Sequence, residues 1–307
     1  LTGSALKQLE RYEEAIVSLQ QTLVLLAPDQ VERRRQTTIH LGEALQRMGR
    51  RDEAHALWEQ GVADGWFPSA DQRPGQVYQR PLPSRPVWDV RDPSVRAGPL
   101  RDIVEELEAT SVWTEIRAES RAAIAAGHFT VDPGSITRYN GGRWYHLVLY
   151  EYGLKDLKNC RLVPHTCATV ESLAEGAVAQ MTQGQVKLSL MSPGIHVLPH
   201  CGPTNTRVRM HLGLCIPSGV DLNFRIGGEN VSWTEGKVTV FDDSFEHEIV
   251  FQDIKAASNY EQERDFEQPP ASAMELIDTG RLVLLFDTWH PSLTPAEIAA
   301  VRATPNT

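Results

Sequence analysis

The hydrophobic residues of this 307-residue chain change their spacing part-way along the sequence, and that change limits the folds it can adopt. In the first 66 residues, apolar side chains recur at the spacing of an amphipathic helix. After residue 126 the pattern consists of short β-prone runs separated by Gly, Pro, Asn and Asp turns. These runs are residues 147–150, 186–190, 208–214, 238–241 and 282–286. The order of the two patterns predicts an α+β chain.

The strand-rich part is predicted to occupy residues 100–307. Several short strands with frequent turns are typical of an antiparallel double-sheet barrel, and we expect a double-stranded β-helix of the jelly-roll or cupin type. A helix is expected first, over residues 100–126. A polar, mostly acidic stretch at about residues 254–279 interrupts the strand pattern, and we interpret it as an inserted, mobile loop.

Residues 1–66 contain two helical units with related apolar patterns, in which Ala54 of the second corresponds to Ala15 of the first. The units are similar to tetratricopeptide repeats, which stack because one unit alone cannot cover its apolar face. They are interpreted as a peptide-docking groove, as an extension of an active-site cleft, or as a packing platform. Repeated prolines over residues 67–99 exclude a continuous helix and predict an extended junction before the strand-rich domain.

The formal net charge of −10 argues against nucleic acid as a partner, because no basic stripe is present to neutralise phosphates. No apolar run approaches the roughly 20 residues of a spanning helix, and the N-terminus lacks the residue order of a signal peptide. We therefore expect a soluble chain with no membrane segment in this fragment. It begins at Leu1 without a methionine, and we expect it to belong to a longer precursor.

The segment SLMSPGIHVLPHCGPTNTRVRMHLGL combines turn residues with two strand-like runs that carry several basic side chains. The two-residue period of a strand places Arg207, Arg209 and His211 on one face and apolar residues on the other. Such a basic row either meets solvent or binds an anion, and arginine suits a carboxylate because its planar fork can bind both oxygens. The spacing alone leaves both interpretations open.

Histidines occur on two of the runs, His200 in the segment above and His247 in GKVTVFDDSFEHEIVF, while Arg281 begins the run RLVLLFDTWHP. Neutral imidazoles from two different strands can hold iron(II) and leave positions open for oxygen and a chelating co-substrate. A single histidine is more often structural, so spacing alone gives this metal site little support.

Three runs, HVLPHCGPTNTRVRMHLGL, FDDSFEHEIVF and RLVLLFDTWHP, closely resemble the catalytic domain of the aspartyl/asparaginyl β-hydroxylase family, in the same order and at nearly the same spacing. The resemblance extends more weakly through GRWYHLVLYEYG and the proline-rich junction. Members of the family also carry helical repeats before the oxygenase domain. The resemblance covers most of the chain, and the insertion at 254–279 is the main departure from it.

The resemblance implies roles for individual residues. His200 and His247 would bind iron(II), and Arg281 would bind the far carboxylate of the co-substrate 2-oxoglutarate. Tyr150 stands where the family usually has a tryptophan against the co-substrate, so an aromatic wall is kept with a different polar tip. Arg207 is predicted to contact a carboxylate of the substrate. The residues implied to complete the co-substrate pocket are Ser189, Arg209 and His211.

The third metal position reads His200-Cys201-Gly202, where most oxygenases of this broad class carry an aspartate or glutamate. Glycine has no ligating side chain. The resemblance implies that water fills this position, because the family has the same arrangement. Cys201, Asp242 and Asp243 remain the alternative ligands.

The resemblance implies an iron(II)- and 2-oxoglutarate-dependent dioxygenase, which consumes O2 and hydroxylates the β-carbon of Asp or Asn residues in a protein. In this family the substrates are disulfide-rich epidermal-growth-factor-like domains, and we expect such a partner here. One alternative is a hydroxylase of a free amino acid or a small biosynthetic intermediate. Another is a non-catalytic peptide-binding protein, against which the intact His200, His247, Arg209 and Arg281 argue.

Cys160 and Cys167 lie close together in KNCRLVPHTC, and their spacing is equally compatible with a disulfide and with two reduced thiols. The resemblance implies that they form a disulfide. A disulfide favours the secretory pathway or the endoplasmic reticulum lumen, with anchorage by an upstream segment left open and the cytoplasm as the alternative. Cys201 and Cys215 are expected to be free core residues.

Overall fold

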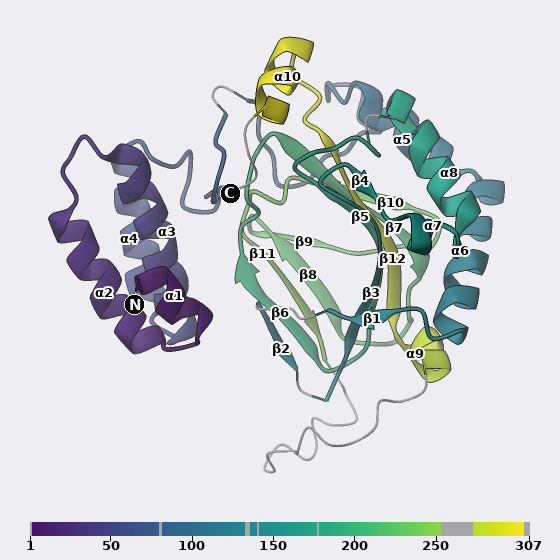
Figure 1. Cartoon of the computed structure of the whole chain (residues 1–307), viewed down its shortest axis with the longest axis horizontal. Coiled ribbons are helices and arrows are strands. Elements are labelled where there is room, and N and C mark those ends of the chain that lie inside the picture. The colour runs from purple at the N-terminus through teal and green to yellow at the C-terminus, as the bar shows by residue number, and fades with distance from the viewer. Residues whose placement is uncertain are drawn as a thin grey trace. The chain divides into compact units, whose positions relative to one another are not determined.

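The computed structural model of the chain describes residues 2–79, 82–132, 136–139, 141–176, 178–252 and 273–303. It divides into two compact units (Figure 1). The first unit comprises residues 1–78 together with the short segments 200–204 and 244–246, and the second comprises the rest. The boundary therefore falls inside the predicted junction over residues 67–99.

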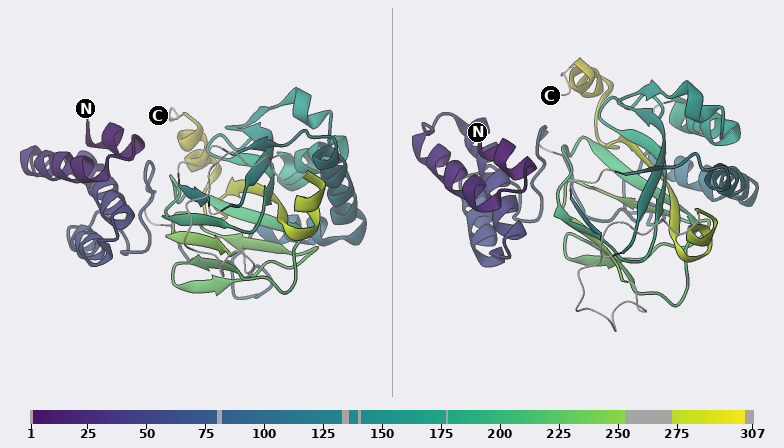
Figure 2. Two further views of the ribbon diagram at one scale, coloured as in Figure 1. Left: turned by 90° about the horizontal axis from the view of Figure 1, so that it is seen from below. Right: turned by 60° about the horizontal axis from the view of Figure 1, so that its bottom comes forward.

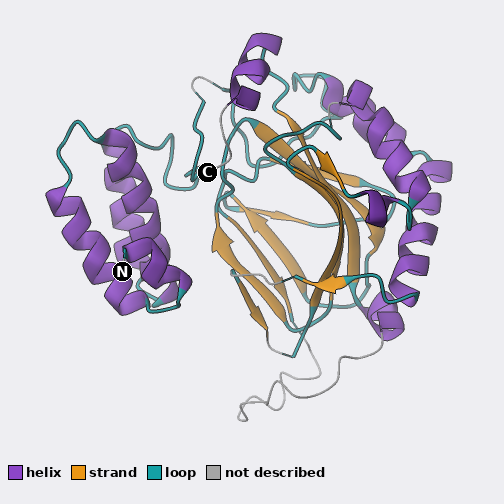
Figure 3. Ribbon diagram, viewed as in Figure 1, coloured by secondary structure: helices purple, strands orange, loops and turns teal. Residues whose placement is uncertain are grey.

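The helices of the first unit are α1 (Gly3–Gln8), α2 (Tyr12–Leu25), α3 (Val31–Arg47) and α4 (Arg51–Ala63). They occur where helical spacing predicted them (Figure 3), and their apolar side chains share one core that includes Ala15, Ala54 and Trp58. A Cβ atom at Gly42 of α3 would lie 2.2 Å from Nε1 of Trp58, so this close approach requires glycine. The similarity to tetratricopeptide repeats stays a prediction.

Two antiparallel sheets form most of the second unit (Figures 1 and 2). The first sheet has the order β1-β3-β5-β12-β7-β10, with β4 beside β3: β1 (Thr130–Val131), β3 (Trp144–Glu151), β4 (Leu154–Lys155), β5 (Gln185–Met191), β7 (Arg207–Cys215), β10 (Val238–Phe241) and β12 (Arg281–Trp289). The second has the order β2-β6-β11-β8-β9: β2 (Thr137–Tyr139), β6 (Ile195–His200), β8 (Leu222–Ile226), β9 (Glu229–Val231) and β11 (His247–Phe251). From β5 onward the described strands alternate between the sheets, except for the hairpin of β8 and β9.

The helices of the second unit are α5 (Pro99–Glu108), α6 (Thr110–Ala125), α7 (Leu157–Cys160), α8 (Pro164–Ser172), a 3-10 turn (Leu173–Gly176), α9 (Ala273–Thr279) and α10 (Pro295–Ala303). The predicted α+β class is confirmed. The helix expected over residues 100–126 is two helices, because Ala109 has an extended backbone (φ −59°, ψ 127°). In the described part of the chain, no helix combines the length and the apolar character needed to cross a bilayer.

The two faces of the first sheet differ in chemistry. One face packs against α5, α6 and α8 (Figure 1), and it carries the even-numbered residues of the central strands. Members of this core are Leu188, Leu190, Val208, Met210, Leu212, Leu282, Leu284 and Phe286, with Leu100, Ile103 and Ile116 from the helices. The odd-numbered residues therefore point to the opposite face, toward the second sheet.

Residues 254–272 of the predicted insertion lie outside the described residues. The end of the insertion is helix α9, so the prediction of a loop over 254–279 is wrong for residues 273–279. Leu276 and Ile277 explain the difference, because both are buried in the core beside the first sheet.

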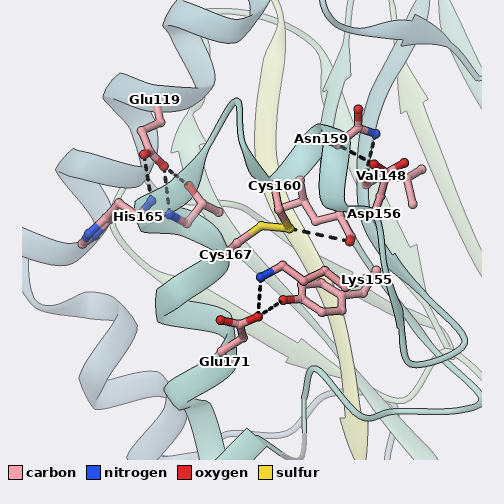
Figure 4. Close-up of a disulfide and its surroundings, with 12 residues drawn as sticks. Glu119, Val148, Lys155, Asp156, Asn159, Cys160, His165, Cys167 and Glu171 are labelled. Carbon is pink, nitrogen blue, oxygen red and sulfur yellow. Dashed lines mark hydrogen bonds and ion pairs between the residues drawn. A yellow bond between two sulfur atoms is a disulfide. The ribbon is translucent and has the colours of Figure 1, made fainter.

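A disulfide joins Cys160, the last residue of α7, to Cys167 in α8, with the Cα atoms 5.7 Å apart (Figure 4). The bridge implied by the family resemblance is confirmed, and Cys201 and Cys215 are free thiols. Glu119 of α6 caps α8 nearby, since its carboxylate accepts the backbone N–H of His165 at 2.8 Å. The bridge and the cap together fix the connection between β4 and β5.

We expect the double variant Cys160→Ser, Cys167→Ser to have a free energy of unfolding about 2 kcal/mol lower than the parent, because the disulfide restricts the unfolded chain. Urea unfolding followed by circular dichroism measures this difference. A reductant should lower the stability of the parent to that of the variant and leave the variant unchanged. Equal stability of the two oxidised proteins would contradict this role of the bridge.

Candidate functional site

The polar face of the first sheet carries the basic residues singled out in the sequence. Arg209 of β7 lies opposite Asp287 of β12, and His211 lies two residues further along the same strand. Ser189 lies on β5, which pairs with the other edge of β12. The predicted alternation along β7 is confirmed, because the residues that alternate with the basic ones are buried in the hydrophobic core. These are Val208, Met210 and Leu212.

Arg207 and Arg209, the two arginines of β7, are paired with buried carboxylates. Arg209 donates to Asp287 from Nε at 2.8 Å and from Nη2 at 3.0 Å, and its Nη1 lies 3.2 Å from Asp243. Arg207 donates to Asp243 from Nη2 at 2.5 Å and from Nε at 3.2 Å. Burial alone would raise the pKa of Asp243, but Arg207 and Arg209 hold it well below its usual range. The charges of the two arginines and the two carboxylates balance within this network. Because Arg207 and Arg209 already have carboxylate partners, their ligand roles stay predictions.

Arg281 differs from them because it has no carboxylate partner in the described part of the chain. Its side chain is buried, with the residue 1% exposed, and its Nη2 donates to Ser189 Oγ at 3.3 Å. Its Nε and Nη1 find no hydrogen-bond partner among the described residues. Burial lowers the pKa of Arg281 to about 9, with no opposing anion, whereas Asp243 and Asp287 outweigh burial and raise the pKa of Arg209. A buried cation of this kind is unfavourable until an anion pairs with it.

His211 offers a further donor beside this cation. Its Nδ1 accepts a hydrogen bond from Trp233 Nε1 at 3.1 Å, and the ring of Trp233 lies 4.6 Å from the guanidinium carbon of Arg281. Burial, followed by the charges of Arg281 and Arg209, lowers the pKa of His211 well below its usual value. The imidazole is therefore neutral, and Nε2 carries the hydrogen because Nδ1 accepts one. This Nε2 also has no protein partner within the described chain.

Trp144 of β3 lies on the other side of Ser189, to which its Nε1 donates at 2.9 Å. Lys187 Nζ lies 5.2 Å from the centroid of the Trp144 ring and 3.2 Å from Asp132. Asp132 also pairs with His146 at 2.9 Å. We expected Tyr150 to be the aromatic wall of the co-substrate pocket, whereas the aromatic side chain that contacts Ser189 is Trp144.

The structure corrects the placement of Tyr150. A β-bulge in β3 between Val148 and Tyr150 shifts the register, so that Tyr150 lies opposite Val186, on the core face. Its hydroxyl donates to Glu171 of α8 at 2.6 Å, and its ring belongs to the core under the helices. A register shift of one residue moves a side chain to the other face, and the sequence does not reveal the bulge.

The predicted metal ligands occupy the ends of two strands. His200 ends β6 and is half-buried, and His247 begins β11 and is buried. Among the described residues, no group of three or more His, Cys, Asp and Glu side chains is arranged to hold a metal ion. Asp243, one alternative third ligand, is engaged by both arginines of the network, whereas Cys201 and Asp242 remain predicted alternatives to water.

Sequence reasoning missed three residues of this site. Asp287 could have been found, because it lies six positions after Arg281 on one strand and therefore shares its face. Trp144 could have been found in the same way from His146, once β3 is paired with the strand of Ser189. Trp233 lies in the loop between β9 and β10, where no periodicity indicates a direction.

Comparison with known proteins agrees with the resemblance seen in the sequence. Residues 110–256 match the family model described as Aspartyl/Asparaginyl beta-hydroxylase. The chain is 36% identical to the aspartyl/asparaginyl beta-hydroxylase of Mus musculus over 265 residues, which are 86% of this chain and 31% of that protein. The chain carries a domain of the aspartyl/asparaginyl β-hydroxylase family.

Other relatives cover less of the chain. The human aspartate beta-hydroxylase domain-containing protein 2 is 34% identical over 160 residues, 52% of this chain and 37% of that protein. Among solved structures, a prolyl-4-hydroxylase of Pseudomonas putida matches 58% of this chain and 86% of its own, with 12% identity and a TM-score of 0.30. A likeness of that size carries no argument about function.

Arg281 lacks a described carboxylate partner, whereas Arg209 has two. Replacing each by methionine should therefore change the free energy of unfolding in opposite directions. In the ligand-free protein, Arg281→Met should raise the free energy of unfolding by about 1 kcal/mol or more, because it removes a buried cation with unsatisfied donors. Arg209→Met should lower it by about 3 kcal/mol, because it leaves buried carboxylates without their counter-charge. Chemical denaturation of the three proteins tests both signs, and a loss of stability in Arg281→Met would contradict the assignment of an unpaired cation.

Proposed function

We propose that this chain is an iron(II)- and 2-oxoglutarate-dependent dioxygenase that hydroxylates the β-carbon of Asp or Asn residues in a protein substrate. The observation that carries the proposal is the buried guanidinium of Arg281, which no described carboxylate neutralises, in a chain that carries a domain of the aspartyl/asparaginyl β-hydroxylase family. The family supports a hydroxylase, and the chemistry of the polar sheet face supports the finer assignment.

The far carboxylate of 2-oxoglutarate fits the needs of Arg281. Its Nε and Nη1 have hydrogens to donate, and a carboxylate could accept both while supplying the missing negative charge. Ser189 already contacts the same guanidinium, and neutral His211 offers one more donor from Nε2. Trp233, stacked beside Arg281, would exclude water and strengthen the charge pair. These residues would bind and orient the co-substrate.

Iron(II) is proposed to bind His200 and His247, with water at the third position. Two imidazoles from strand ends suit iron(II), and the alternation of strands between two sheets is that of a double-stranded β-helix, the fold we propose for the domain. Bound there, iron(II) would supply the redox chemistry by which one O2 converts 2-oxoglutarate to succinate and CO2 and hydroxylates the substrate carbon. The paired Arg207, Arg209, Asp243 and Asp287 would keep the neighbouring wall fixed.

The proposed substrates are epidermal-growth-factor-like domains, and the proposed location is the secretory pathway or the endoplasmic reticulum lumen. The Cys160–Cys167 disulfide supports an oxidising compartment, in which disulfide-rich partner domains are also formed. The chain spans about a third of the length of the mouse relative. Because the relative has a large part that this chain does not match, activity on such a substrate has to be tested with this chain itself.

We expect the chain, supplied with iron(II), 2-oxoglutarate and O2, to form succinate and to add the mass of one oxygen atom to an epidermal-growth-factor-like domain. Mass spectrometry and succinate assay measure the two products. His247→Ala should abolish both, and Arg281→Met should reduce 2-oxoglutarate-dependent turnover about 100-fold, because a charge-assisted contact to the co-substrate is lost.

Two other outcomes would redirect the proposal. Succinate formed with free aspartate or asparagine, but without oxidation of the domain, would favour a small-molecule hydroxylase. Failure to bind both iron(II) and 2-oxoglutarate, with peptide binding retained, would favour a non-catalytic interaction protein.

A further inference from the structure

The chain that follows α4 contacts two other parts of the first unit. Residues 71–77, here called the clamp segment, pair with both short segments of that unit, 200–204 and 244–246. Isolated β-bridges at both segments extend this pairing. The main-chain hydrogen bonds run from Gly75 N to Gly202 O at 3.2 Å, from Gln76 N to Pro203 O at 2.7 Å, from Arg73 N to Ser244 O at 3.2 Å and from Glu246 N to Asp71 O at 2.6 Å.

These two segments are the ones next to the proposed metal ligands. His200 is the first residue of one segment, and Glu246, the last residue of the other, directly precedes His247. The clamp segment therefore fixes the main chain beside both histidines, although it supplies neither of them.

Arg73 is the side chain that ties this arrangement to the helices. It is 3% exposed, its guanidinium carbon lies 3.5 Å from the ring centroid of Trp58 in α4, and it pairs with Glu246 at 2.7 Å. Gln46 of α3 donates to the same Glu246 carboxylate at 3.0 Å. Glu246 is thus held by a buried ion pair to Arg73 of the clamp segment and by a hydrogen bond from Gln46 of α3. Such an ion pair fixes position because breaking it leaves a buried charge.

We propose that Arg73 is a positioning residue for the metal site, acting through Glu246 on His247 and through the clamp segment on His200. The helical region then acts on the chemistry by holding the metal ligands, which is a different role from docking a peptide. This inference rests on the proposed metal-binding role of the two histidines. Residues that orient the metal ligands without touching the metal commonly change the affinity of the site for the metal.

The test is anaerobic titration of the purified chain with cobalt(II), whose visible absorption reports both affinity and ligand geometry. Arg73→Gln should weaken cobalt(II) binding about tenfold and alter the absorption band. Arg50→Gln is the matched control, because it removes an arginine from an exposed ion pair with Glu53 in the same unit. This control should bind cobalt(II) as the parent does.

A milder pair of variants guards against misfolding of Arg73→Gln. Gln46→Ala removes one hydrogen bond to Glu246, and Gln60→Ala removes a bond of the same kind to Asp64 on the exposed surface of α4. Gln46→Ala should weaken cobalt(II) binding severalfold and speed amide hydrogen exchange in 244–248 of the metal-free protein, while Gln60→Ala should do neither.

The outcomes separate this inference from the proposed function. Cobalt(II) affinity and spectrum unchanged in both Arg73→Gln and Gln46→Ala, with only the unfolding temperature lowered, would show a purely structural clamp and overturn the inference while leaving the metal site in place. If the parent chain binds no metal, the proposed function fails and the inference fails with it.

Discussion

One buried charge without a described counter-charge, that of Arg281, sets the chemistry of the polar sheet face. The guanidinium of Arg281 is buried at the start of β12, contacts Ser189 and Trp233, and has no carboxylate partner within the described chain. Folding a protein around such a group is costly, so its place is explained best by a ligand that brings the missing anion. Arg209 on the neighbouring strand β7 shows the contrasting case, because Asp287 and Asp243 already neutralise it.

The first sheet can hold both the unpaired Arg281 and the paired Arg209 in a stable fold because its two faces differ. Its even-numbered residues build a continuous hydrophobic core with α5 and α6, so that the opposite face is free to carry charged side chains. On that face, the network of Arg207, Arg209, Asp243 and Asp287 is balanced and buried. Polar groups that satisfy one another remain fixed, and Arg281 and His211 are among the described groups that keep donors to spare.

Features that follow from strand periodicity or from family motifs could be predicted from the sequence. The strand faces around Arg209 and the Cys160–Cys167 disulfide are confirmed. Features that depend on a local irregularity or on distant pairing could not be predicted. A bulge in β3 moved Tyr150 to the core face, and the pairing of the clamp segment, residues 71–77, joins parts of the chain more than 100 residues apart.

The most direct test of the role of Arg281 compares two ligands that differ only at the end proposed to bind it. Binding of 2-oxoglutarate and of 2-oxopentanoate, in which a methyl group replaces the far carboxylate, is measured by calorimetry in the anaerobic iron(II)-loaded parent and in Arg281→Met. The parent is expected to prefer 2-oxoglutarate by about 10- to 100-fold, and Arg281→Met is expected to lose this preference. A preference that survives in Arg281→Met would place the carboxylate elsewhere and contradict the role proposed for Arg281.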